Sequence, residues 1–182
     1  MTKDKNNPGV SATAAAPARE PAASDTTPEQ TGAELAAQFK VRPSEVAILQ
    51  LESNLLRFLY PEELKTAGSI PLSSSTAVAA HTAQTKKVEL FNNFTKVKHV
   101  SIFETIKLGS VESDEEPPPP VIQKLMSGPV LDEKGRVLGV IQVCRKAYDL
   151  RSAGPDFTLD DLQQLETTAK AIAKTNLLRK KS

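Results

Sequence analysis

The sequence has little of several residues on which common functions depend, and each shortage excludes a class of protein. One cysteine in 182 residues cannot form an intramolecular disulfide framework, which favours a reduced, intracellular setting. With 23 basic and 22 acidic residues, the chain lacks the positive surplus typical of proteins that bind nucleic acid. Two histidines and one cysteine do not complete a four-ligand zinc site, so no metal site is predicted.

Long apolar runs are also missing from the sequence. The N-terminus, MTKDKNNPGV, carries charges but lacks the apolar core of a secretory signal. No stretch approaches the ~20 apolar residues that a membrane-spanning helix needs. These absences predict a cytoplasmic protein with no membrane partner.

The composition divides the chain into an arm and one domain. Residues 1–26 are rich in Ala, Pro, Thr and Ser, and Val10 is their only sizeable branched apolar side chain. Such a segment cannot offset roughly 1–2 kcal/mol of backbone entropy per residue, so we expect a disordered arm, either solvated or partner-binding. Residues 27–182 are long enough for one stable domain. Within it, the acidic and then proline-rich stretch 109–120 predicts an exposed loop that is polyproline-like at its end.

Two segments have the pattern of β-hairpins. Residues 45–52 and 55–60 are dense in β-forming residues and are separated by the polar pair Ser53-Asn54. The second hairpin runs over residues 121–146 and turns at 132–135, where Gly135 can adopt a positive φ. Both alternating faces of its second strand are mostly apolar. We therefore expect that strand in the middle of a sheet covered on both sides.

Helices are predicted before, between and after these hairpins. Thr27 and Thr158 each start a capping box, and the apolar stripe of the last helix indicates a core-facing helix rather than a coiled coil. A helix of small residues is expected over 73–85, followed by a short strand over 87–91. Antiparallel hairpins with interspersed helices predict an α+β fold.

The segments IQKLMSGPVLDEKGRVLGVIQVCRK and DFTLDDLQQLE resemble the GAF domain, a small-molecule-sensing relative of the PAS fold. The shared features are a D-x-x-G turn between strands, a G-V-I-x-x strand ending in lysine, and Phe-Thr-x-x-Asp at the start of the last helix. The resemblance covers about residues 35–178. It implies a central antiparallel sheet with the terminal helices on one face, often pairing with a second subunit. It also implies a pocket, roofed by a helix and a loop, over the other face.

One part of the resemblance concerns cyclic nucleotides. GAF domains that bind them carry an Asn-Lys and Phe-x-x-x-Asp-Glu signature, which Lys146, Phe157 and Asp161 match. Arg145 and Leu162 replace the other two residues, which argues against cyclic-nucleotide binding. The resemblance also implies an ion pair between Lys146 and Asp161 that ties the strand to the helix as part of the scaffold.

The expected pocket would be lined by polar and aromatic residues of the segment after the short strand and by one residue of the central hairpin: Phe91, Asn92, Asn93, His99, Phe103, Glu104 and Gln142. Plainer interpretations stay open for several of these residues. Asn92-Asn93 could simply end a strand, and Glu104 could face water. His99 could bond a ligand, ligate haem as in some sensor domains of this family, or do neither, and His81 is expected at a helix surface.

Cys144 is the one residue with potential thiol chemistry. A thiol near Lys146 could have a depressed pKa and act as a redox sensor, although a free cysteine is usually a small buried hydrophobe. GAF-type methionine sulfoxide reductases need several cysteines, so the sequence argues against that enzyme. No Ser-His-Asp order, phosphate-binding loop or carboxylate pair stands out, and the chain is predicted not to be an enzyme.

The leading interpretation is a stand-alone GAF-like sensory or regulatory domain that binds a small molecule, of unknown identity, and signals through a partner protein. The alternative is a ligand-free interaction module whose terminal helices form a homodimer or dock a partner. A third interpretation is a redox sensor that acts through Cys144.

Overall fold

The computed structural model describes residues 26–96 and 117–179. These residues form a six-stranded antiparallel sheet in the order β3-β2-β1-β6-β5-β4. The strands are β1 (Val46–Glu52), β2 (Leu55–Tyr60), β3 (Ser69–Pro71), β4 (Glu89–Phe91), β5 (Val121–Leu131) and β6 (Val137–Ala147). The longer helices are α1 (Pro28–Phe39), α2 (Val78–Thr85) and α4 (Leu159–Ala173), and the short 3-10 turns are η1 (Pro43–Glu45), η2 (Glu62–Leu64) and η3 (Phe94–Lys96).

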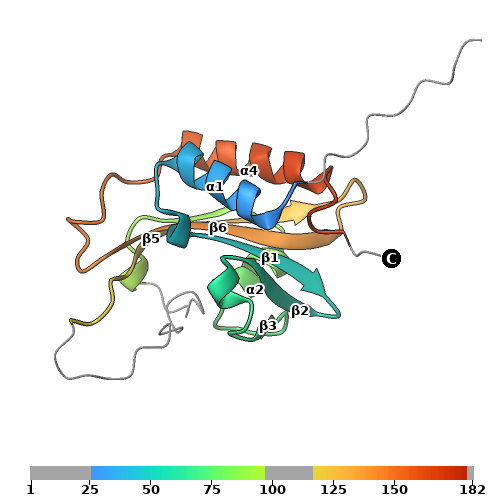
Figure 1. Ribbon diagram of the computed structural model, residues 1–182, viewed down its shortest axis with the longest axis horizontal. Coiled ribbons are helices and arrows are strands. Elements are labelled where there is room, and N and C mark those ends of the chain that lie inside the picture. The colour runs from blue at the N-terminus through green and yellow to red at the C-terminus, as the bar shows by residue number, and fades with distance from the viewer. Residues whose placement is uncertain (1–25, 97–116, 180–182) are drawn as a thin grey trace, which may run out of the picture.

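The layers match the predicted α+β architecture. Helices α1 and α4 lie side by side over one face of the sheet, and α2 lies on the other face (Figure 1). Strand β6 pairs with β1 on one side and β5 on the other, which confirms the prediction that it is a central strand. The terminal helices therefore share one face, as expected.

Turn chemistry fixes both hairpins. Ser53 and Asn54 have φ of 50° and 64°, as a two-residue hairpin turn of the primed type requires. Gly135 has φ of 71°, and the Asp132 carboxylate accepts hydrogen bonds from the backbone N–H groups of Lys134 and Arg136 at 2.9 and 2.8 Å. Both predicted hairpins are confirmed.

Two of the three longer helices begin at the predicted capping residues, and the third begins later than predicted. Thr27 and Thr158 form the predicted capping boxes of α1 and α4. Helix α2 begins at Val78, five residues later than expected, because Ser74 Oγ accepts a hydrogen bond from the Ala77 N–H at 3.2 Å within a turn that precedes the helix. Strand β4 is likewise shorter than the predicted strand.

Two apolar cores lie on opposite faces of the central hairpin. Ile141 and Val143 of β6 pack against α1 and α4, whereas Val140 and Cys144 belong to the core beneath α2. Gln142 lies two residues from both Val140 and Cys144 on the strand, so it projects from the same face, toward α2. The main α1 and α4 contributions to the first core are Leu35, Ala36, Phe39, Leu165, Ala169 and Ile172.

Glycine is required where β1 and β6 approach closely. A Cβ atom added to Gly139 would lie 2.1 Å from the carbonyl oxygen of Leu49 and 3.1 Å from Cδ1 of Leu178. Backbone atoms cannot move aside as a flexible side chain can. Gly139 therefore sets the contact between the two hairpins that make up the centre of the sheet.

The predicted arm and loop fall mostly outside the described residues. Of the stretch 109–120, residues 117–120 are described, and Pro117, Pro118 and Pro119 are exposed without regular secondary structure. Among the helices that are described, none is both long and apolar enough to cross a membrane.

Candidate functional site

A chain of hydrogen-bonded polar side chains lies beneath α2. Nε2 of Gln142 donates to Ser127 Oγ at 3.3 Å, and Ser127 Oγ lies 2.7 Å from Thr82 Oγ1. Thr82 Oγ1 lies 2.6 Å from Glu89 Oε2, and the other carboxylate oxygen lies 2.8 Å from His81 Nδ1. These five side chains, here called the polar row, connect the interior of the domain to the surface.

Strand register places three members of the polar row side by side. Glu89 of β4 is paired with Ser127 of β5, and Ser127 is paired with Gln142 of β6. Partners in register on neighbouring antiparallel strands project from the same face of a sheet. Thr82 then reaches this row from α2 above, and His81 precedes Thr82 on the same helix.

The donors and acceptors of the polar row have a defined direction. An ionised carboxylate only accepts hydrogen bonds, so Thr82 is the donor in its contact with Glu89. Thr82 Oγ1 is also placed to donate to Ser127 Oγ, which accepts a further hydrogen bond from Gln142. Glu89 and Ser127 therefore share the hydroxyl of Thr82, which joins α2 to both β4 and β5.

Burial makes the polar row energetically important. Thr82 and Ser127 are fully buried, and Gln142 is 2% exposed, among the apolar side chains of the α2 core. A buried polar group left without a partner costs about 1–3 kcal/mol. The side chain of His81 is 45% exposed and that of Glu89 is 17% exposed, so the row opens to solvent at this end.

The position of α2 depends on these contacts. It has eight residues, too few for a stable isolated helix, and its N-cap residue Ala77 makes no side-chain capping hydrogen bond. Its buried residues Ala79, Ala80 and Ala83 are small, which lets the helix lie close to the sheet. Packing of small side chains and the Thr82 hydroxyl therefore hold α2 in place.

The predicted pocket residues that the structure describes have mainly structural contacts. Phe91 is half-buried and meets Phe94 edge to face, with ring centroids 6.0 Å apart. Asn92 holds the backbone of Phe157 with two hydrogen bonds of 2.9 Å, and Asn93 Oδ1 accepts from Thr95 Oγ1 at 3.0 Å. Only Gln142 joins the polar row. The remaining predicted residues, His99, Phe103 and Glu104, lie outside the described part of the chain.

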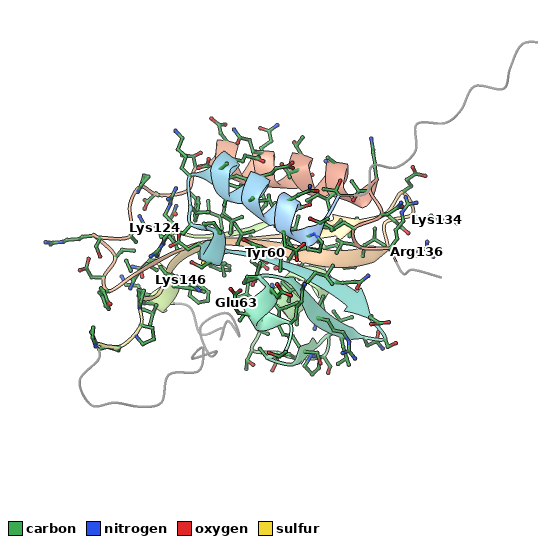
Figure 2. The ribbon with its side chains drawn as sticks, viewed as in Figure 1. Tyr60, Glu63, Lys124, Lys134, Arg136 and Lys146 are labelled. Atoms are coloured by element: carbon green, nitrogen blue, oxygen red, sulfur yellow. The ribbon has the colours of Figure 1, made fainter. Side chains whose placement is uncertain are left out.

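The two groups of the expected scaffold ion pair take part in different interactions. Asp161 accepts from the backbone N–H and hydroxyl of Thr158 at 2.7 and 3.0 Å in the cap of α4. The ammonium of Lys146 donates to the carbonyl of Ser44 at 3.3 Å. An ion pair near this position instead joins Asp156 to Lys124, whose buried ammonium lies 2.7 Å from the carboxylate. Figure 2 shows Lys124 and Lys146 toward the same end of the molecule.

Arg145 of β6, which replaces the asparagine of the cyclic-nucleotide signature, binds the C-terminal end of α1. Its guanidinium donates to the carbonyl oxygens of Phe39 and Lys40, both at 3.2 Å, and lies 4.7 Å from the ring centroid of Phe157. Cations at a helix C-terminus are favoured by the helix dipole. The substitution therefore has a structural role in joining α1 to the segment before α4.

Glu45 is a buried carboxylate at the start of β1. Burial opposes its ionisation, but hydrogen bonds from the side chain of Arg42 and the backbone N–H groups of Lys146 and Arg42 outweigh burial and hold its pKa below the usual range. The contact of Glu45 with Lys146 is 2.7 Å and ties η1 to β6. This group stabilises the fold and lies apart from the polar row.

Cys144 lies in the core beneath α2 with 0% exposure. A thiol that solvent cannot reach is poorly placed to react with oxidants. Within residues 26–96 and 117–179, no group of three or more His, Cys, Asp or Glu side chains could hold a metal ion.

The sequence predicted only one member of the polar row. Three members were not marked by any sequence signal. Ser127 belongs to no recognised motif, Thr82 is one of several small residues in its helix, and Glu89 is a single charged residue in a short strand. His81 was predicted at the helix surface, and its bond to Glu89 could not be inferred. His81 and Thr82 are neighbours in the sequence, and this spacing does not indicate a shared contact with Glu89. That contact becomes evident only when the register of β4 and β5 is known.

The comparisons with known proteins identify the fold. No protein-family model matches the sequence, and no curated protein matches it. Among solved structures, the GAF domain of a phosphoenolpyruvate-protein phosphotransferase from Acinetobacter is 16% identical with a TM-score of 0.57, covering 80% of this chain and 76% of that one. Residues 122 to 287 of a methyl-accepting chemotaxis protein are 17% identical with a TM-score of 0.54, covering 83% and 89%. The protein therefore has the GAF fold.

One similar structure corrects a prediction. A type II free methionine-R-sulfoxide reductase from Thermoplasma acidophilum is 15% identical with a TM-score of 0.53, covering 79% of this chain and 87% of that one. The prediction that the protein is not an enzyme is contradicted, because an enzyme shares this fold. The lack of familiar catalytic motifs was an insufficient reason for that prediction.

Proposed function

We propose that the protein is a sensory or regulatory domain that binds a small polar molecule on the α2 side of its sheet. The observation that carries this proposal is the polar row, a connected set of donors and acceptors in an otherwise apolar layer. A fold that needed only stability could fill this layer with apolar side chains at similar or lower free energy. The open end at His81 and Glu89 gives a ligand from solvent access to the row.

The proposed response is a movement of α2. A ligand that bonds to Glu89 or Ser127 competes with Thr82, which removes the polar link between α2 and the sheet. The C-terminal end of α2 is tied to the central hairpin because Lys86 Nζ donates to the carbonyl of Gly135 at 2.8 Å. A shift of α2 would therefore be transmitted to the β5–β6 turn and from there to a partner protein.

Pairing of two copies through the terminal helices is a separate prediction. The groove between α1 and α4 is polar and is closed by hydrogen bonds of 3.1 and 3.2 Å between Gln38 and Thr168. This surface favours a partner that supplies hydrogen bonds over an apolar one. We therefore rest the proposed function on the α2 side.

Thermal denaturation with a panel of small molecules tests the proposal. The panel should include nucleotides, haem, flavins, amino acids and 2-oxo acids. A ligand at 100 times its Kd adds about 2.7 kcal/mol to the free energy of unfolding, which raises Tm by roughly 5–10 °C for a domain of this size.

Variants locate any ligand that the panel finds. Gln142→Leu removes the inner end of the polar row and should reduce the shift by at least half. Gln163→Leu makes the same chemical change on the exposed surface of α4 and should leave the shift intact. Absence of a shift across the whole panel, or equal shifts in both variants, would count against sensing by the polar row.

A further inference from the structure

Two adjoining cavities border the turn end of the central hairpin. The first, about 670 Å³, lies between the β5–β6 turn and the C-terminal end of α4. The second, about 410 Å³, lies between α4 and the connection from α2 to β4. They share Leu131 and Lys170 in their walls. Each has the size of a small-molecule site, for which ~300–1,000 Å³ is typical.

Positive charge is concentrated around these cavities. The whole chain has 23 basic and 22 acidic residues, so its charges nearly cancel. The cavity walls instead carry seven cations against the three acids Asp132, Glu133 and Glu166. The cations come from four separate segments: Lys86, Lys87, Lys134, Arg136, Lys170, Lys174 and Arg179. Figure 2 shows Lys134 and Arg136 at this end, far from Lys124 and Lys146.

Most of these cations are not neutralised by the protein. Arg136 Nε pairs with Asp132 at 2.6 Å, and Lys170 Nζ pairs with Glu166 at 2.7 Å. The Asp132 carboxylate is further held by turn N–H groups, which together with Arg136 lower its pKa and keep it ionised. In the part of the chain that the structure describes, five cationic side chains of the cavity walls make no ion pair: Lys86, Lys87, Lys134, Lys174 and Arg179. Of these, Lys86 donates to the carbonyl of Gly135.

The helix dipole explains only part of this arrangement. Lys170 lies in the last turn of α4 and Lys174 is its C-cap, where cations are favoured. Lys134 belongs to the hairpin turn and Arg179 to the C-terminal segment, so neither is part of the helix. Their approach to the same cavity brings like charges together, and a bound anion would relieve that repulsion.

The cavity walls are apolar between the charges. Leu131, Leu138 and Ala173 line the first cavity, and Val88 and Pro129 line the second. A free inorganic ion would leave this apolar surface unused. A molecule with an apolar body and an anionic group would cover it and meet the cations at the rim.

We propose that this end of the domain, here called the hairpin-tip site, binds a small organic phosphate through its dianionic group and its apolar body. Lys134 and Arg179 face the phosphate, and Leu131, Leu138 and Ala173 contact the apolar body. Glu133 lines the same cavity and makes no ion pair within the described residues, so it repels the anion. The site is separate from the polar row and does not depend on the proposed function.

Isothermal titration calorimetry with three probes tests the site on the full chain. 1-Naphthyl phosphate carries both parts of the proposed ligand, inorganic phosphate only the anion and 1-naphthol only the apolar body. We expect 1-naphthyl phosphate to bind at least tenfold more tightly than either fragment. Its binding should weaken as sodium chloride is raised from 50 to 500 mM, because exposed charges are screened.

Charge variants locate the binding. The double variant Lys134→Gln/Arg179→Gln should weaken binding of 1-naphthyl phosphate about tenfold, and Glu133→Gln should strengthen it by about twofold to threefold. Arg151→Gln removes a charge from the loop beyond the far end of β6 and should change nothing. Equal binding of inorganic phosphate, no binding of any probe, or equal affinities in the double variant and the wild type would overturn the proposal.

Discussion

The polar row makes a sharp prediction for a double-mutant cycle. Thr82→Val keeps the shape of the side chain and removes the hydroxyl that lies 2.6 Å from Glu89 and 2.7 Å from Ser127. Ser127→Ala removes the partner hydroxyl and leaves Gln142 without its bond to β5. Each change leaves a buried polar group unsatisfied, so each should lower the free energy of unfolding by about 2 kcal/mol.

The double variant should be less destabilised than the sum of the two changes. After the first substitution the Thr82–Ser127 bond is already lost, so the second cannot remove it again. We expect a coupling free energy of about 1 kcal/mol and a total loss of about 3 kcal/mol. For a domain of this length, each single change corresponds to a fall in Tm of roughly 4–8 °C.

Urea denaturation followed by circular dichroism measures all four proteins. Thr167→Val is the matched control, because Thr167 is exposed on α4 and its hydroxyl donates within its own helix, at 2.9 Å to the Gln163 carbonyl. It should change the free energy of unfolding by less than about 0.5 kcal/mol. Additive effects of Thr82→Val and Ser127→Ala, or single effects no larger than the control, would refute the account of the polar row.

Three further predictions concern the scaffold. Gly139→Ala should destabilise the protein by about 3 kcal/mol or more in urea denaturation, since its Cβ would lie 2.1 Å from the Leu49 carbonyl oxygen; a loss below 1 kcal/mol would contradict the close approach. The folded-state pKa of Glu45 is depressed, so its ionised form stabilises the protein above the unfolded pKa of about 4.3 and this contribution is lost as pH falls through the folded pKa. Wild type should therefore exceed Glu45→Gln in stability at pH 7, with the difference shrinking at pH 3, and a constant difference would contradict this. Cys144 should react with iodoacetamide only on unfolding, and rapid alkylation of the native protein would revive the redox-sensor hypothesis.

Local chemistry made much of the fold predictable from the sequence. Ser53-Asn54 and Gly135 mark their turns because few residues tolerate positive φ, and Thr27 and Thr158 mark helix starts because their hydroxyls satisfy free N–H groups. The apolar faces of β6 likewise identified a central strand. Each of these signals depends on residues that are close in the sequence, so it can be recognised without knowledge of the tertiary structure.

The site depends on contacts between distant segments, which the sequence does not mark. Asn92 was expected near a ligand, and its two bonds go to the backbone of Phe157, 65 residues away. Ser127 and Gln142 meet only because of the β5–β6 register, and Thr82 joins them because α2 crosses that pair. Alternation predicted the two faces of β6 but not which one would lie beneath α2.

Hydrogen exchange of the α2 amides tests the central claim most directly. The measurement compares the protein alone with the protein bound to whichever panel compound raises its Tm. The account predicts that exchange changes at least threefold in residues 78–85 and in the β5–β6 turn, and that Thr82→Val abolishes the difference. Changes confined to α1 and α4, with α2 unaffected in both proteins, would contradict it.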